Sequence, residues 1–154
     1  MTPVACVVVG TDGSHHSLEA ARAGLALLAS PARVVLVTAV PPVDQMMIAG
    51  TGFAGGVMSP QMYDEMSAAR TAEGEEILAR TAAAIPDAPV ETLIAWGDAG
   101  EALVSMAAEL SADAIVVGSR GLGGVKRFLL GSVSTYVVNN APCPVVVVPG
   151  ADDD

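Results

Sequence analysis

Five short apolar runs, separated by segments with helical periodicity, are the feature that most constrains the fold of this chain. They fall at residues 4–9, 34–40, 90–95, 114–117 and 145–148. Apolar runs of this length, rich in valine and bounded by turn residues, are typical of strands buried on both faces of a parallel sheet. Their alternation with helices predicts an α/β fold in which right-handed crossovers place helices on both faces of the sheet.

The segments between the runs carry specific helix signals. Apolar residues recur at helical spacing within residues 18–28. Ser59 followed by Pro60 predicts an N-cap and the first helical residue. Asp98 and Glu101 fit the capping pattern of another helix. We therefore expect ordinary capped helices between the strands.

Residues 45–63 carry no charge and contain four glycines, which is unusual inside a compact domain. A loop of this length is either a functional lid or a mobile segment, and we favour the second. The helix that follows has Met62 and Met66 at helical spacing. We expect these two methionines to fill the core, because flexible thioether side chains suit irregular gaps.

The order of the strands is open from these patterns alone. An order of 3-2-1-4-5 makes the first and fourth strands neighbours, whereas a flavodoxin-like order of 2-1-3-4-5 separates them. We predict the first of these. The 154 residues suit one doubly wound, Rossmann-like domain of five parallel strands over residues 1–150, followed by an acidic tail at 151–154.

The strongest functional signal follows the fourth apolar run. Gly118 and Gly121 let backbone N–H groups approach an anion without a Cβ in the way. Gly131 and Ser132 open the next helix, whose first N–H groups and dipole favour negative charge, and Ser132 and Ser134 add hydroxyls. The set predicts a phosphate cradle that is neither a Walker A loop nor a GxGxxG fingerprint.

The charge of the chain limits its ligands. A formal net charge of −10 argues against nucleic acid, whose phosphates require a basic face. Arg120, Lys126 and Arg127 nevertheless fall within eight positions. This cluster indicates either a local anionic ligand or a solvated basic loop, and charge alone does not separate the two.

The spacing Gly118-x2-Gly121-x9-Gly131-Ser132 resembles the ATP-binding signature of the universal stress protein family, and residues 9–14 resemble that family's first strand and turn. The resemblance covers nearly the whole chain. It implies an ATP-binding regulatory or stress-response protein, with Mg²⁺ accompanying the triphosphate and at most slow hydrolysis. One departure is Gly10, where ATP-binding relatives often carry proline.

The resemblance also implies roles for single residues. Asp12 would accept hydrogen bonds from the ribose hydroxyls, although an Asx-turn or helix-capping role is an alternative that can coexist with it. Val117 would pack on the base or ribose, and the adenine would be bordered by Gly10, Thr11 and Ala39. The phosphates would be held by Gly118, Gly121, Gly131, Ser132, Val133 and Ser134.

Two other functions stay open. One is a module for another adenine nucleotide, such as cyclic AMP. The other is an ATP-using hydrolase or transferase, but the chain has no HxGH or SGGxDS motif and no evident pair of catalytic carboxylates. His15 and His16 are interpreted as polar residues on the first turn of a helix, without a metal role.

The last apolar run bears on assembly. Four consecutive valines on an edge strand are an aggregation hazard unless they are covered. We expect residues 144–148 to pair in a homodimer, as the resemblance also implies, although the strand's own helices are an alternative cover. The chain contains no run of eighteen apolar residues, the length that would predict a membrane span, so we expect a cytoplasmic protein. We expect Cys6 and Cys143 to be buried free thiols.

Overall fold

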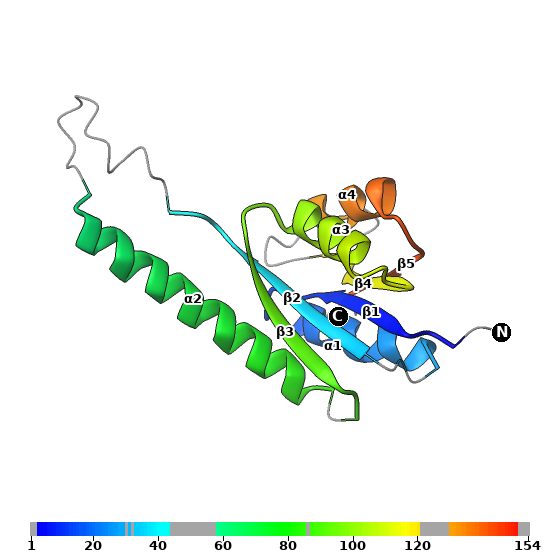
Figure 1. Ribbon diagram of the computed structural model, residues 1–154. Helices are drawn as coiled ribbons and strands as arrows, with labels where there is room; N and C mark the ends of the chain where they lie inside the picture. Colours follow the sequence, from blue (N-terminus) through cyan, green and yellow to red (C-terminus); the bar gives the residue numbers. More distant parts are fainter. Residues whose placement is uncertain are drawn as a thin grey trace.

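The computed structural model describes residues 3–29, 31, 33–43, 58–85, 87–120 and 130–150. Strands and helices alternate along this part of the chain (Figure 1). The strands are β1 (Cys6–Gly10), β2 (Arg33–Val40), β3 (Val90–Trp96), β4 (Ala114–Gly118) and β5 (Val145–Val148). The helices are α1 (His15–Leu27), α2 (Pro60–Ala83), α3 (Ala99–Glu109) and α4 (Ser132–Asn140). The predicted α/β alternation is confirmed.

All strand pairs in the sheet are parallel, and the strand order is β3-β2-β1-β4-β5. This confirms the order 3-2-1-4-5 and excludes 2-1-3-4-5. The central strand β1 pairs with β2 on one side and with β4 on the other, where Val9 lies opposite Val116. The carboxyl ends of β1 and β4 therefore lie side by side, which is where a doubly wound sheet binds ligands.

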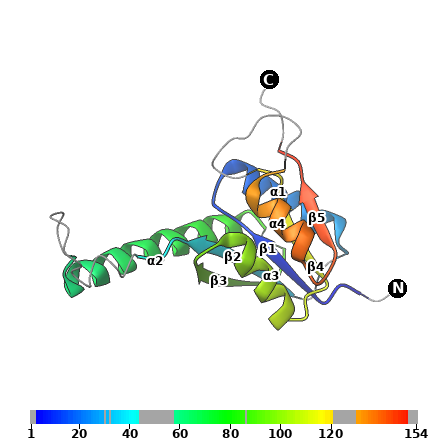
Figure 2. The ribbon, with the colours of Figure 1, turned by 90° about the horizontal axis from the view of Figure 1, so that it is seen from above.

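Helices cover both faces of the sheet (Figures 1 and 2). One core cluster joins the sheet to α1 and α2, and the other joins it to α3 and α4. Consecutive valines of β1 divide between them, since Val7 and Val9 belong to the first cluster and Val8 to the second. All three valines are fully buried, so the prediction of a strand buried on both faces is confirmed for β1, and most residues of β2 and β4 are buried as well. The edge strands differ, because β5 is half-buried throughout and β3 is half-buried or exposed.

The predicted helix caps are present. The side chain of Ser59 accepts a hydrogen bond from the backbone N–H of Met62 at 3.2 Å. The carboxylate of Asp98 accepts one from the N–H of Glu101 at 2.9 Å. Each bond satisfies one of the N–H groups that the start of a helix leaves without a partner.

The methionines of α2 do not fill the core, contrary to the prediction. Met62 and Met66 are 51% and 37% exposed, because the first half of α2 projects beyond the sheet (Figures 1 and 2). The helix first packs closely at Gly74, where a Cβ would lie 3.3 Å from Cγ1 of Val40 at the end of β2. Residues 44–57, which make up most of the predicted long loop, lie outside the described residues, as do residues 151–154.

The two cysteines differ in burial. Both are free thiols, as expected. Cys6 is buried, which confirms the prediction for that residue, whereas Cys143 is only half-buried. No helix in the described ranges is both long enough and apolar enough to cross a membrane.

Candidate functional site

A cavity of about 340 Å³ opens at the carboxyl ends of β1, β2 and β4, beside the first turns of α3 and α4. It is lined by Gly10, Thr11, Asp12, Ser17, Val37, Ala39, Ala99, Leu103, Val117, Gly118, Ser119, Arg120, Gly131, Ser132, Val133 and Ser134. Ten of the eleven residues predicted to hold a nucleotide are in this lining. The eleventh, Gly121, lies outside the described residues.

The strand order gives the cavity two chemically different sides. Toward β2 and α3 the wall is apolar, with Val37, Ala39 and Leu103. Toward β4 and α4 it is formed by small and polar residues, among them Ser119 and Arg120. Such a site can hold a flat apolar group on one side and an anion on the other.

The anion side is built by close contact between the end of β4 and the start of α4. The backbone N–H of Gly131 donates to the carbonyl oxygen of Ser119 at 2.8 Å. A Cβ at Gly131 would lie 3.3 Å from that oxygen, and a Cβ at Gly118 would lie 3.3 Å from the carbonyl oxygen of Arg120. Glycine at these two positions therefore lets two backbone segments lie close together. This is a second reason for glycine there, besides the access to a ligand that the spacing predicts.

Gly131 is the N-cap of α4, and as a glycine it brings no side chain to cap the helix. The N–H groups of the first helical turn have no partner within the helix, and their dipoles favour an anion. Ser132 and Val133 belong to this turn and line the cavity. This part of the wall is suited to phosphate oxygens.

The hydroxyl of Ser134 makes hydrogen bonds within the protein that the sequence did not predict. Its side chain is buried, and its hydroxyl donates to the carbonyl oxygen of Gly131 at 3.1 Å, with that of Ser119 at 3.4 Å. The hydroxyl hydrogen thus holds the start of α4 against the end of β4. The predicted contact of Ser134 with a phosphate stays a prediction.

The turn after β1 brings a carboxylate to the cavity. The N–H of Thr11 donates to the carbonyl oxygen of Val37 at 3.0 Å, which ties the turn to β2. Asp12 accepts the N–H of Ser14 on Oδ1 at 2.9 Å, so the predicted Asx-turn is present. Gly13 follows with φ +76°, a left-handed conformation that favours glycine. Asp12 lines the cavity from this turn, and its ribose contact stays a prediction.

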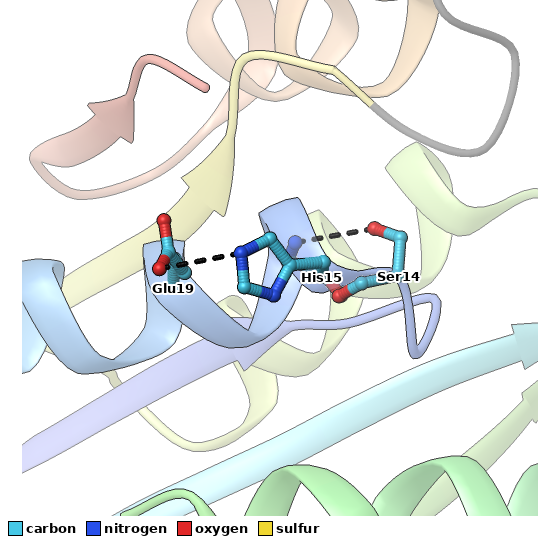
Figure 3. Close-up of polar contacts among 4 residues, drawn as sticks. Ser14, His15 and Glu19 are labelled. Carbon is cyan, nitrogen blue, oxygen red and sulfur yellow. Dashed lines mark hydrogen bonds and ion pairs between the residues drawn. The ribbon is translucent and has the colours of Figure 1, made fainter. Parts of the chain in front are cut away.

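The two histidines occupy the first turn of α1, as the sequence indicated. Figure 3 shows the His15 ring directed toward Glu19, and Nε2 lies 3.4 Å from the carboxylate oxygen Oε1 on the exposed surface. Ser14 caps the same turn by accepting the N–H of Ser17 at 3.1 Å. In the part of the chain that the structure describes, no three His, Cys, Asp or Glu side chains are grouped to hold a metal ion.

Five lining residues were not singled out from the sequence: Ser17, Val37, Ala99, Leu103 and Ser119. No local pattern in the sequence shows that the helix carrying Leu103 borders the site. Arg120, one of the three clustered basic residues, does line the cavity. Lys126 and Arg127 lie outside the described residues.

Comparison with known proteins assigns nearly the whole chain to one family. The family model described as the universal stress protein family matches residues 6–149. A universal stress protein encoded in the QAH/OAS sulfhydrylase 3′ region of Thermus aquaticus is 34% identical over 143 residues, which are 92% of this chain and 96% of that protein.

Two solved structures extend the comparison. Hypothetical protein MJ0577 superposes with a TM-score of 0.77 at 22% identity, over 99% of this chain and 100% of that chain, and shares the fold. A universal stress protein solved in complex with cAMP superposes with a TM-score of 0.62 at 29% identity, over 97% of this chain and 100% of that one.

Proposed function

The chain belongs to the universal stress protein family, and from this premise we propose that it is a stress-response regulator that binds ATP in the cavity described above. Occupancy would shift its stability, assembly or partner binding by mass action, because a ligand that binds the native state alone stabilises that state. The proposal includes a cytoplasmic location, which fractionation of cells would test.

The two sides of the cavity give each part of ATP a place. Adenine would lie against the apolar wall, bordered by Gly10, Thr11 and Ala39. Asp12 would accept hydrogen bonds from the ribose hydroxyls, and the phosphates would lie at the start of α4, near Gly118. Mg²⁺ would accompany the triphosphate, since this ion is commonly held through substrate phosphates and few protein groups.

The observation that carries the proposal is the convergence of separate segments on one cavity. The turn after β1, the end of β2, the end of β4 and the start of α4 are far apart in the chain, and all contribute predicted ligand residues to it. The volume of about 340 Å³ falls within the range of about 300–1,000 Å³ usual for small-molecule sites.

Calorimetric titration of MgATP into protein cleared of co-purifying nucleotide tests this proposal. Asp12→Ala should weaken binding roughly ten- to a hundredfold, the range for hydrogen bonds to a charged group. Gly131→Ala should weaken it as well, because the added Cβ would press on the carbonyl oxygen of Ser119. Asp87→Ala, at an exposed aspartate outside the lining, is the matched control. A folded parent that does not bind MgATP would contradict the proposal.

A second candidate ligand is cyclic AMP, favoured by the 29% identical relative solved with it. The two nucleotides share adenine and ribose but differ in phosphate charge and length. Competition between them at matched concentrations separates the two. Displacement of ATP by a small excess of cyclic AMP would favour the cyclic nucleotide, and the reverse result would favour ATP.

We also propose a homodimer formed through residues 144–148, which comprise Pro144 and β5. β5 is an edge strand of the sheet, and its four valines are each half-buried in the single chain. Pairing with a second copy would cover that edge and remove the exposed pairing groups. Sedimentation velocity at micromolar concentration should give the mass of two chains, and a mass of 15.4 kDa would contradict the dimer.

A further inference from the structure

Three buried hydroxyls from three elements meet behind the turn that follows β1. They belong to Thr11 after β1, Ser17 in the first turn of α1, and Thr81 near the end of α2. Oγ1 of Thr11 lies 2.8 Å from Oγ1 of Thr81 and 3.1 Å from Oγ of Ser17. Thr11 and Ser17 also line the cavity, so this cluster joins the cavity wall to α2.

Two of these hydroxyls also donate to backbone carbonyl oxygens. Thr81 donates its hydroxyl hydrogen to the carbonyl oxygen of Ile77 at 2.9 Å. Ser17 donates in the same way to the carbonyl oxygen of Ser14 at 2.9 Å. Thr11 has one hydroxyl hydrogen for two neighbouring hydroxyls, so either oxygen can be the donor in its contacts with Thr81 and Ser17. Oγ1 of Thr11 in turn accepts the N–H of Gly13 at 3.2 Å. A connected set of hydrogen bonds thus joins the turn after β1 to the backbone of α2.

This chain of bonds holds the part of the turn that carries Asp12. Thr11 is fixed by its N–H on β2 and by its hydroxyl on α2, and the Gly13 N–H closes the turn back onto that hydroxyl. Asp12 lies between these two anchored residues. Removal of the Thr81 hydroxyl would take away the shorter of the two hydroxyl contacts of Thr11, and loss of a buried hydrogen-bond partner is unfavourable.

We propose that Thr81 is a positioning residue for the nucleotide site: it acts through Thr11 and sets the place of Asp12. This inference rests on the proposed function. Thr81 is fully buried and is not among the residues that line the cavity, so it would act without touching the ligand.

Thr71 offers a matched control on the same helix. Its hydroxyl donates to the carbonyl oxygen of Ser67 at 3.0 Å, which is the same four-residue bond that Thr81 makes to Ile77. Thr71 is half-buried and does not line the cavity. Thr71→Val therefore removes the local helix bond alone, whereas Thr81→Val removes that bond and the one to Thr11.

The experiment compares the Kd of MgATP for the parent, Thr81→Val, Thr81→Ser and Thr71→Val at a temperature where circular dichroism shows all four folded. Loss of one hydrogen bond corresponds to about a three- to tenfold change in Kd. We expect the Kd of Thr81→Val for MgATP to rise by about three- to tenfold. The Kd values of Thr81→Ser and Thr71→Val should stay within about twofold of that of the parent. If Thr81→Val does not fold, Thr81→Ala serves as the variant without the hydroxyl.

The outcomes separate this inference from the function on which it rests. Binding by the parent with an unchanged Kd in Thr81→Val would overturn the positioning role and leave the ATP site intact. Equal weakening in Thr71→Val, or no rescue in Thr81→Ser, would show a general effect on α2 and also overturn it. A folded parent that does not bind MgATP would overturn the proposed function, and the inference with it.

Discussion

The side chain of Leu103 occupies the space that a side chain at Gly10 would need. A Cβ at position 10 would lie 2.8 Å from Cδ1 of Leu103 and 3.3 Å from Cγ1 of Val117. Leu103 comes from α3 and Gly10 ends β1, yet both line the cavity. The apolar wall therefore depends on a glycine and a leucine that fit each other.

This pair makes a prediction about coupling. Gly10→Ala should lower the free energy of unfolding by about 1–3 kcal/mol, because the added methyl group overpacks a filled site. In a Leu103→Ala background the same change should cost little, although Leu103→Ala by itself removes about 2–5 kcal/mol. Urea unfolding of the parent, both single variants and the double variant measures the coupling. Additive effects would contradict the fit between the two positions.

A second prediction concerns the close approach of α1 to β4. A Cβ at Gly24 would lie 2.3 Å from Cγ1 of Val116, a distance that requires the helix or the strand to move. Gly24→Ala should therefore destabilise by about 1–3 kcal/mol, despite the better helix propensity of alanine. Arg22→Ala, on the exposed side of α1, should stay within about 0.5 kcal/mol of the parent in the same urea titration. A Gly24→Ala variant more stable than the parent would contradict the close contact between Gly24 and Val116.

The third prediction is a dependence of stability on pH. Hydrogen bonds from the N–H groups of Cys6 and Ala5, at 2.9 and 2.7 Å, lower the pKa of Asp113 below its ordinary value. Because the folded pKa is lower than the unfolded value of about 3.9, this stabilisation is complete well above that pH. It is lost as the pH falls through the folded pKa.

Urea unfolding midpoints measured between pH 7 and pH 2.5 test whether this stabilisation is lost as the pH falls. Asp113→Asn should be less stable than the parent near neutral pH, and the difference should narrow at acidic pH as Asp113 is protonated in the parent. A difference that stays constant over the whole range would mean that the carboxylate charge at position 113 has no part in stability.

The fourth prediction concerns the two thiols. Burial raises the pKa of both Cys6 and Cys143, so each is a weak nucleophile at neutral pH. Extended by one residue and by two residues, the register of β4 with β1 and with β5 would place both cysteines opposite Asp113, on either side of β4. Strands two places apart are about 10 Å apart, beyond the limit of about 7 Å between the Cα atoms of a disulfide.

We therefore expect slow alkylation of both thiols in the folded protein, with Cys143 the faster because it is half-buried. Mild oxidation should give no disulfide within the chain. Iodoacetamide labelling followed by mass spectrometry measures the first expectation, with urea-unfolded protein as the control. An intrachain disulfide formed without loss of circular dichroism signal would contradict the register.

Local patterns in the sequence predicted much of the site, and packing supplied the rest. The glycine and serine positions around β4 and α4 were visible because turns and helix starts impose residue types on neighbouring positions. Leu103 and Ser17 were not visible, because each has an ordinary local role and reaches the cavity through the arrangement of its helix. The exposure of Met62 was also hidden, since helical spacing does not tell where a sheet ends.

The sequence by itself determined the alternation of strands and helices, the caps at Ser59 and Asp98, and the glycine pattern that indicated a phosphate site. These follow from interactions between residues a few positions apart, so they can be read along the chain. The tertiary structure alone decided that β1 lies between β2 and β4, that Leu103 fits against Gly10, and that Thr81 reaches Thr11. Those contacts join residues up to 107 positions apart, as Val9 and Val116 are. They depend on which faces the helices and strands bury together, which no local pattern records.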